Sequence, residues 1–297
     1  MKAIYAHYST PYGGDIRNAH THWAFPYVEF LLLAYSSAKM KFFGNTTTLV
    51  TDEYGKKLII DELQIPFDEV LVELDNCEKK KRFWAAGKIY AYTKAIKEFE
   101  PYIMVDNDAG FHEAPPKELM DEPYLCQHIH HNNNHEFGNY VRYLVSKTPN
   151  VFPYGIFHEF EHEIHGCNSW IVVCNDKELH DEFSRYTWAL MNDPFFDHLE
   201  KQATKPIYEH FSYWNVVVEE ILRCCLHRRL RGKEPRALFD FHGFDFPPNT
   251  PNPHKYFHIW GSKRDEEFLK QRELLAVDFL PKELTDRIYN YFELATA

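Results

Sequence analysis

The chain has 297 residues, of which 44% are hydrophobic and 16% aromatic, enough for one large globular domain or two small ones. A net charge of −11, from 33 basic and 44 acidic residues, argues against non-specific nucleic-acid binding and against electrostatic anchoring to a membrane surface. We find no signal-peptide core in MKAIYAHYS and no run of about 18 apolar residues that would span a bilayer. The six cysteines are scattered and lack a metal-type C-x-x-C pair. We therefore expect a cytoplasmic protein with reduced thiols.

The first hundred residues predict strands that alternate with helices. We expect strands at 2–8, 47–51 and 69–74, and helices at 23–40, 55–63 and 83–99. This alternation predicts a parallel sheet with right-handed crossovers. The turn-prone loop after the first strand could receive a base and ribose at Tyr8, Ser9 and Thr10. A plain surface loop is the alternative.

The central feature of the sequence is the segment 102–108. The apolar run Tyr102-Ile103-Met104-Val105 predicts a strand buried on both faces, as in the middle of a parallel sheet, and it ends in Asp106-Asn107-Asp108. Open α/β sheets bind ligands at the carboxyl ends of their strands. Two carboxylates one residue apart can bind Mg²⁺ or Mn²⁺, which in turn can hold a diphosphate. This D-x-D pattern is typical of metal-dependent glycosyltransferases, and a solvated acidic turn is the alternative.

One basic residue could serve this segment. Lys88 lies near the start of the helix that precedes the central strand. Its ammonium group could reach a phosphate or the two nearby carboxylates. A solvated lysine is the alternative interpretation.

Two histidine-containing stretches follow. Residues 126–135, CQHIHHNNNH, fit a polar loop that lines a cleft better than a metal site, because no histidine pair has the i, i+4 spacing of an evident helix. The stretch His158-Glu159-Phe160-Glu161-His162 is a literal H-E-x-x-H, the zinc-binding motif of metallohydrolases. The candidate helix is short and flanked by Gly155 and Gly166, which disfavours that reading but leaves it as an alternative function.

The second half of the chain predicts one more buried strand and three helices. The strand, within 166–175, follows the polar residues Asn168 and Ser169. A helix over 213–231 carries Glu219 and Glu220 among apolar residues, and a carboxylate that faces a core needs a reason to be there. The alternative is that both glutamates are tolerated at the edge of the helix. Helices at 264–276 and 281–295 form a C-terminal tail.

Three motifs occur in a familiar order: Asp106-Asn107-Asp108, Asn168-Ser169 before a strand, and His258-Ile259-Trp260-Gly261-Ser262-Lys263. In this order they resemble the GT-A type glycosyltransferases of the glycogenin and lipopolysaccharide-galactosyltransferase family, and related bacterial glycosyltransferases. Trp170 stands where that family has a small glycine, and Val218-Glu219-Glu220 is the nearest match to its Asp-Gln-Asp.

The resemblance implies an α/β fold of GT-A type, with a Rossmann-like, mostly parallel sheet flanked by helices and a C-terminal helical tail. It implies a single domain over 1–297, with a nucleotide-binding half at about 1–110, an acceptor- and metal-closing half at about 111–265, and a tail at 266–297.

The resemblance also implies the chemistry: a hexosyltransferase-like enzyme with a nucleotide-sugar donor, above all a UDP-sugar, a saccharide or lipid-linked saccharide acceptor, and Mn²⁺ or Mg²⁺. Asp106, Asp108 and His258 would be the metal ligands, and Lys263 would hold the diphosphate. Asn168 would touch the donor sugar and, with Glu219 or Glu220, supply the catalytic side chains. A non-catalytic sugar-nucleotide-binding protein is a further alternative.

Overall fold

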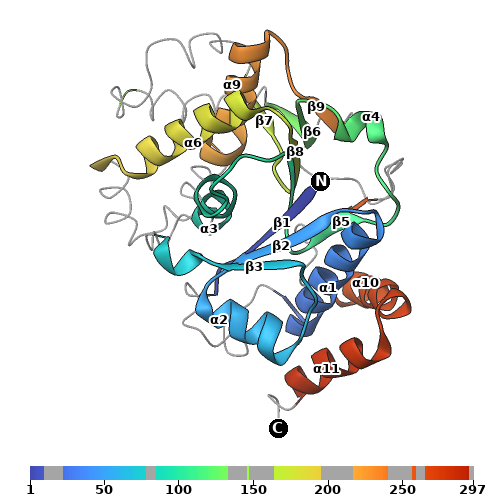
Figure 1. The fold of residues 1–297 in the computed structure, drawn as a ribbon. Helices are drawn as coiled ribbons and strands as arrows, with labels where there is room; N and C mark the ends of the chain where they lie inside the picture. The colour runs from blue at the N-terminus through green and yellow to red at the C-terminus, as the bar shows by residue number, and fades with distance from the viewer. Residues whose placement is uncertain are drawn as a thin grey trace.

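An eight-stranded sheet forms the centre of the computed structural model (Figure 1). The structure describes residues 1–9, 23–77, 85–132, 146, 164–194, 217–239, 256–258 and 265–293. The sheet has the strand order β3 (Glu69–Val72), β2 (Thr46–Thr51), β1 (Lys2–His7), β4 (Tyr102–Val105), β8 (Ile171–Cys174), β6 (Tyr124–Asn132) and β7 (Ile164–Cys167), and β9 (Arg236–Phe239) pairs with β6.

Most strands of this sheet run in one direction. β3, β2, β1 and β4 are parallel neighbours, β8 is antiparallel to both β4 and β6, and β9 is parallel to β6. β6 and β9 therefore also share the direction of β4, and only β8 and β7 are opposed. The predicted mostly parallel α/β sheet is confirmed. The expectation of a parallel neighbour on each side of β4 is wrong, because β8 enters the sheet from the edge where β4 ends.

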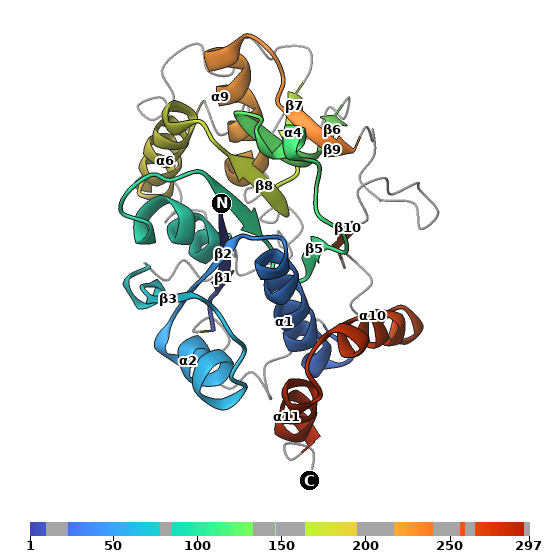
Figure 2. The same cartoon turned by 45° about the vertical axis from the view of Figure 1, so that its right-hand side comes forward.

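Helices cover both faces of the sheet (Figures 1 and 2). One layer contains α3 (Ala86–Tyr90), the π-helical segment η4 (Ala91–Ala95), α6 (Lys177–Met191), η6 (Val217–Ile221) and α9 (Leu222–Arg231). The other contains α1 (Pro26–Phe42), α2 (Glu53–Lys56), η2 (Lys57–Glu62), α10 (Glu266–Phe279) and α11 (Lys282–Glu293). The predicted C-terminal helical tail is confirmed, and it packs against α1. No helix in the described ranges is long and apolar enough to cross a membrane.

Alternation along the central strand decides which layer each side chain joins. In β4, Tyr102 and Met104 belong to the core beside α3, whereas Ile103 and Val105 belong to the core beside α1. All four are buried, as the unbroken apolar run predicts. Asp106 continues this alternation toward α3.

A second, two-stranded sheet extends the end of β4. β5 (Ala109–Phe111) follows the Asp106–Asp108 segment directly and pairs antiparallel with β10 (Tyr256–His258). The register places His258 opposite Ala109 and Tyr256 opposite Phe111. The remaining described elements are α4 (Lys117–Met120) and the short 3₁₀ turn η3 (Leu74–Asn76).

Several helix boundaries follow capping signals in the sequence. Asp52, Asp176 and Asp265 each accept a backbone N–H in the first turn of α2, α6 and α10. Gly232 ends α9 with φ of 69°, the left-handed conformation that favours glycine. The helix expected at 83–99 is shorter, because Ile96 is already extended after η4.

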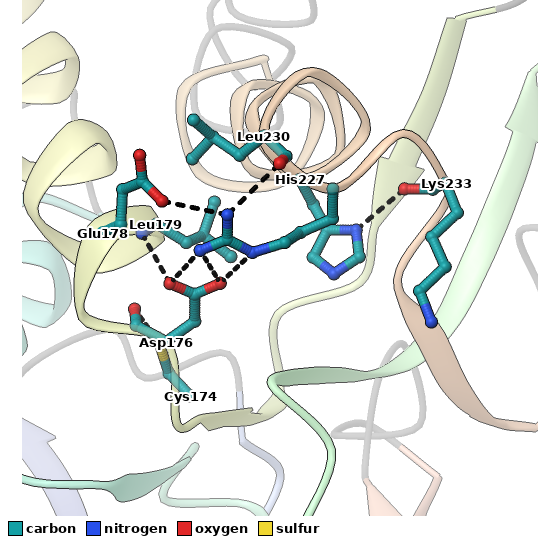
Figure 3. Close-up of polar contacts among 8 residues, drawn as sticks. Cys174, Asp176, Glu178, Leu179, His227, Leu230 and Lys233 are labelled. Atoms are coloured by element: carbon teal, nitrogen blue, oxygen red, sulfur yellow. Dashed lines mark hydrogen bonds and ion pairs between the residues drawn. The ribbon is translucent and has the colours of Figure 1, made fainter.

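An ion-pair cluster joins α6 to the end of α9 (Figure 3). The Arg231 guanidinium donates to both carboxylate oxygens of Asp176, at 2.6 and 2.7 Å, and to Glu178 at 2.9 Å. Asp176 also accepts the Leu179 N–H, so one carboxylate caps α6 and binds α9. The side chain of Asp176 is 7% exposed, whereas that of Glu178 is 60% exposed.

We predict that Asp176→Ala lowers the free energy of unfolding by about 1–3 kcal/mol, because it removes a helix cap and a bidentate ion pair together. Glu178→Ala is the matched control, since it removes only the exposed arm and should cost about 0.5 kcal/mol or less. Urea unfolding monitored by circular dichroism measures both values. Equal losses in the two variants would show that the cap and the bidentate geometry contribute nothing.

Candidate functional site

The strand order of the sheet reverses between β1 and β4, the position at which open α/β sheets bind ligands. The carboxyl ends of these strands lie side by side, and the Asn107 side-chain amide donates to His7 Nδ1 at 3.2 Å. The loop before β8 reaches the same edge, where the Asp106 N–H donates to the Trp170 carbonyl at 2.9 Å. The predicted D-x-D segment therefore lies at the switch point of the sheet.

A buried lysine connects the elements around this edge. Lys88 Nζ lies 2.6 Å from Asp106 Oδ1 and 2.7 Å from Glu219 Oε1, and it donates to the Ser169 carbonyl at 2.9 Å. The Lys88 side chain is 12% exposed. Of the two interpretations of Lys88, the structure thus supports the one in which it reaches the carboxylates, and the solvated lysine is wrong.

Close packing of α3 on β1 places Lys88. A Cβ at Gly87 would lie 2.9 Å from Tyr8 Cβ and Cδ1, so only glycine allows the first turn of α3 to approach the end of β1 this closely. The Tyr8 hydroxyl donates to the Cys77 carbonyl at 3.4 Å, which fixes the ring. Tyr8, predicted as a nucleotide contact, therefore also positions the lysine.

Glu219 and Glu220 are both buried, so the expectation that at least one faces the core is confirmed. They lie in the π-helical turn η6, a local widening that often occurs at functional sites. Glu219 pairs with Lys88, while Glu220 accepts the Ser169 backbone N–H and packs beside Gly166. The Ser169 residue is thus held through its carbonyl by Lys88 and through its N–H by Glu220.

Burial raises the pKa values of two carboxyl groups at this edge, Asp106 and Glu220. Burial, together with Asp108 and Glu219, raises the pKa of Asp106 to about 7, although Lys88 opposes the shift. Burial and the neighbouring Glu219 raise the pKa of Glu220 to about 8. For Lys88, burial lowers the pKa, but the Asp106 and Glu219 carboxylates outweigh it and leave the pKa above its usual value. Such shifts are common at functional sites.

The small sheet completes the surroundings of the second aspartate. Asp108 is 6% exposed and lies near Tyr256, whose hydroxyl accepts a hydrogen bond from Gln127. Because β10 pairs with β5, the backbone of His258 lies level with Ala109, the residue after Asp108. Residues distant in the chain, Gln127 from β6 and Tyr256 and His258 from β10, are thereby brought close to the D-x-D segment.

The donor set suits a hard cation. Asp106 and Asp108 offer carboxylate oxygens, the ligands that Mg²⁺ and Mn²⁺ prefer. Within the described residues, no group of three or more His, Cys, Asp or Glu side chains is placed to hold a metal ion. Further ligands would therefore have to come from the His258 imidazole, which lies outside the described side chains, and from a bound phosphate.

Several buried polar atoms at this edge lack hydrogen-bond partners in the described part of the chain. They are His7 Nε2, Ser9 Oγ, Asn107 Oδ1 and Ser169 Oγ. Burial lowers the pKa of His7 to about 4 despite Asp52, so the ring is neutral, and the amide donated to Nδ1 leaves the ring proton on Nε2. Buried polar groups are normally satisfied, so such a cluster indicates a place for a polar ligand.

The predicted site residues divide into two groups. Tyr8, Ser9, Lys88, Asp106, Asp108, Asn168, Glu219, Glu220 and the backbone of His258 are described, and the ion pairs, strand pairing and loop contacts bring them to one edge of the sheet. Thr10, Lys263 and the stretch 158–162 lie outside the described residues. His7 and Asn107 were missed, although a polar residue at the end of each buried strand was a usable signal.

The fold and these contacts define an α/β protein with a buried cluster of charged side chains at the switch point of its sheet. The chain belongs to DUF6734, a family of unknown function whose profile matches residues 1–289. No curated protein matches it.

Two solved structures of the galactosyltransferase LgtC are similar to the chain: a complex with donor and acceptor sugar analogs, at 12% identity and a TM-score of 0.43, and an active-site mutant, at 11% identity and 0.41. Each comparison covers 97% of this chain and 100% of that chain.

We predict that Glu220→Gln stabilises the fold at pH 8 by at least about 1 kcal/mol. The carboxyl pKa is about 8 in the folded chain against a usual 4.5, so between these values the unfolded chain ionises first and stability falls as pH rises. The glutamine of the variant does not ionise, so this pH-dependent loss of stability is absent. Thermal unfolding at pH 5 and pH 8 checks the sign, with the exposed Glu118→Gln as control. A Glu220→Gln variant no more stable than wild type at pH 8 contradicts the shift.

Proposed function

We propose that the chain is a metal-dependent glycosyltransferase that moves a sugar from a nucleotide-diphosphate-sugar, a UDP-sugar above all, to a saccharide-type acceptor. The observation that carries the proposal is the position of Asp106-Asn107-Asp108 at the β1/β4 switch point, with β10 paired beside it. A D-x-D segment in a solvated turn would have neither the buried lysine nor the returning strand around it. The contacts therefore favour a binding site over an acidic turn.

The donor would bind across the carboxyl ends of β1 and β4. Tyr8, Ser9 and Thr10 would contact the base and ribose. The unpartnered Ser9 Oγ, His7 Nε2 and Asn107 Oδ1 support polar contacts in this region. His7 Nε2–H and Asn107 Oδ1 form a donor and an acceptor that could read the edge of a base. Lys263 would hold the diphosphate.

The proposed cation ligands are Asp106, Asp108 and His258. Two observations support this set: the aspartates supply carboxylate oxygens, and the pairing of β10 with β5 places the backbone of His258 opposite Ala109. When bound, Mn²⁺ or Mg²⁺ would neutralise the charge that develops on the leaving diphosphate. Lys88 adds a fixed positive charge to the same place, because two carboxylates keep it protonated and in position.

The remaining polar groups would orient the sugar. Asn168 Oδ1 accepts the Trp170 N–H at 3.3 Å, and its backbone bonds to Gln127 and His128, so the residue is held between β6 and the loop that contacts Asp106. Glu220, with a pKa of about 8, is protonated at neutral pH and could donate a proton or hydrogen bond. Asn168, Glu219 and Glu220 are therefore the proposed catalytic side chains. A non-catalytic relative would bind a UDP-sugar yet release no UDP.

We predict that Asp108→Asn removes Mn²⁺-dependent UDP binding with little change in the unfolding temperature. The loss of one anionic oxygen ligand should weaken UDP binding at saturating Mn²⁺ by at least about tenfold, down to the metal-free level. Isothermal titration calorimetry with and without Mn²⁺ measures this, and Asp121→Asn, an exposed aspartate after α4, is the matched control. Unchanged Mn²⁺ dependence in Asp108→Asn would remove the D-x-D segment from the proposed metal site.

We also predict that cation-dependent donor binding weakens as pH falls below about 7. The pKa of Asp106 is about 7, so at lower pH a proton competes with the cation for its carboxylate, with a limiting loss of about tenfold per pH unit. UDP-glucose is the probe, because its diphosphate diester does not titrate near pH 6 as free UDP does. Affinity that is flat from pH 8 to pH 6 would contradict the role of Asp106.

A further inference from the structure

Arg223 is a fully buried cation behind the Asp106 site. It lies in the first turn of α9 with 2% of its surface exposed. Its guanidinium carbon is 4.2 Å from the ring centroid of Phe183 and 4.6 Å from that of Tyr92. Nη1 donates to the Tyr124 hydroxyl at 3.5 Å, and Nη2 has no hydrogen-bond partner in the described part of the chain.

Packing does not account for this residue. An arginine is always charged, and a buried charge needs a compensating charge or full hydrogen bonding. Phe183, Tyr92 and Tyr124 provide ring faces and one long hydrogen bond but no negative charge. Burial lowers the pKa of the Arg223 guanidinium, but the neighbouring tyrosines and the Glu219 carboxylate, four residues earlier on the same helical segment, outweigh it and leave the pKa above its usual value.

Two helical segments face each other with a matched pair of residues. α3 and η4 carry Lys88 and Tyr92, four residues apart, and η6 and α9 carry Glu219 and Arg223, also four apart. Residues at this spacing share one helix face. Lys88 pairs with Glu219 at 2.7 Å, and Tyr92 stacks with Arg223, so the charges alternate along a buried row: Arg223, Glu219, Lys88, Asp106.

We propose that Arg223 is a positioning residue for the Asp106 site, which it reaches through Glu219 and Lys88. Arg223 holds Glu219 as the second partner of Lys88, so that the ammonium is shared between two carboxylates. Without Arg223, Glu219 would be one more uncompensated buried carboxylate near Asp106, and it would turn away from Lys88. Lys88 would then bind Asp106 alone and compete with a cation for that carboxylate. This inference rests on the proposed metal-dependent donor site.

The test compares Arg223→Met with Arg223→Lys, and its readout is the Mn²⁺ concentration that gives half-maximal UDP-glucose binding. Arg223→Met keeps the length of the side chain and removes its charge. It should raise that concentration by about tenfold, a usual size for coupling between two sites. Arg223→Lys restores the charge and should recover most of the loss. Recovery by lysine is a result that a purely structural role would not produce.

Phe183→Leu is the structural control, because it removes a ring beneath the guanidinium and leaves every charge in place. It should lower the unfolding temperature and leave the Mn²⁺ requirement unchanged. If Arg223→Met does not fold, Glu219→Gln tests the same link and should raise the Mn²⁺ requirement alike. In a folded double variant the two effects should not add, because both act on Lys88.

Two failures can be told apart. A wild-type protein that binds UDP-glucose without any Mn²⁺ dependence overturns the proposed function and this inference with it. A wild-type protein that needs Mn²⁺, together with an unchanged requirement in folded Arg223→Met, overturns the inference alone. If the Mn²⁺ requirement of Phe183→Leu rises as much as that of Arg223→Met, the inference is also overturned, because Arg223 would then act only through packing.

Discussion

The sharing of one buried ammonium between two carboxylates is the interaction on which the site depends. Lys88 lies between Asp106 and Glu219 at nearly equal distances and also binds the Ser169 carbonyl. It therefore connects α3, the end of β4, the loop before β8 and the π turn of η6. Burying these charges is unfavourable unless each is paired, so the surrounding elements can pack only in the arrangement that pairs them. The geometry of the site and that of the fold are fixed by the same contacts.

Strand direction explains why these elements meet. β1 and β4 end at one edge of the sheet, and β8, which runs the other way, begins there. A loop that enters an antiparallel strand is thus brought to the carboxyl end of its neighbour, as the bond from the Asp106 N–H to the Trp170 carbonyl shows. A fully parallel sheet would have placed Asn168 and Ser169 at the opposite edge. The antiparallel β8, which the sequence analysis did not anticipate, is what brings the second motif to the first.

Local patterns predicted the strands and helices well, because these depend on periodicity and caps that are read within a few residues. The unbroken run at 102–105 forms the buried strand that it predicts, and the helices expected at 23–40 and 213–231 correspond to α1 and, in the described part, to η6 and α9. Contacts between segments that are far apart in the chain could not be predicted from such local patterns. The position of Lys88 depends on how closely Gly87 approaches Tyr8, and the role of Arg223 on rings contributed by three other elements. Neither follows from the sequence around the residue itself, since a lysine or arginine on a helix is usually solvated.

The aromatic richness of the chain has a physical role beside this charged row. Tyr92, Tyr102, Tyr124 and Phe183 form the wall between the sheet and α6 and α9. Ring faces attract a guanidinium, and Arg223 donates one long hydrogen bond to the Tyr124 hydroxyl, so these residues hold the guanidinium in place but do not balance its charge. A carboxylate placed directly on Arg223 would have neutralised it and left Glu219 with Lys88 alone. Because aromatic rings hold the guanidinium without cancelling its charge, its field remains available to Glu219, and through Glu219 to the lysine that Asp106 shares.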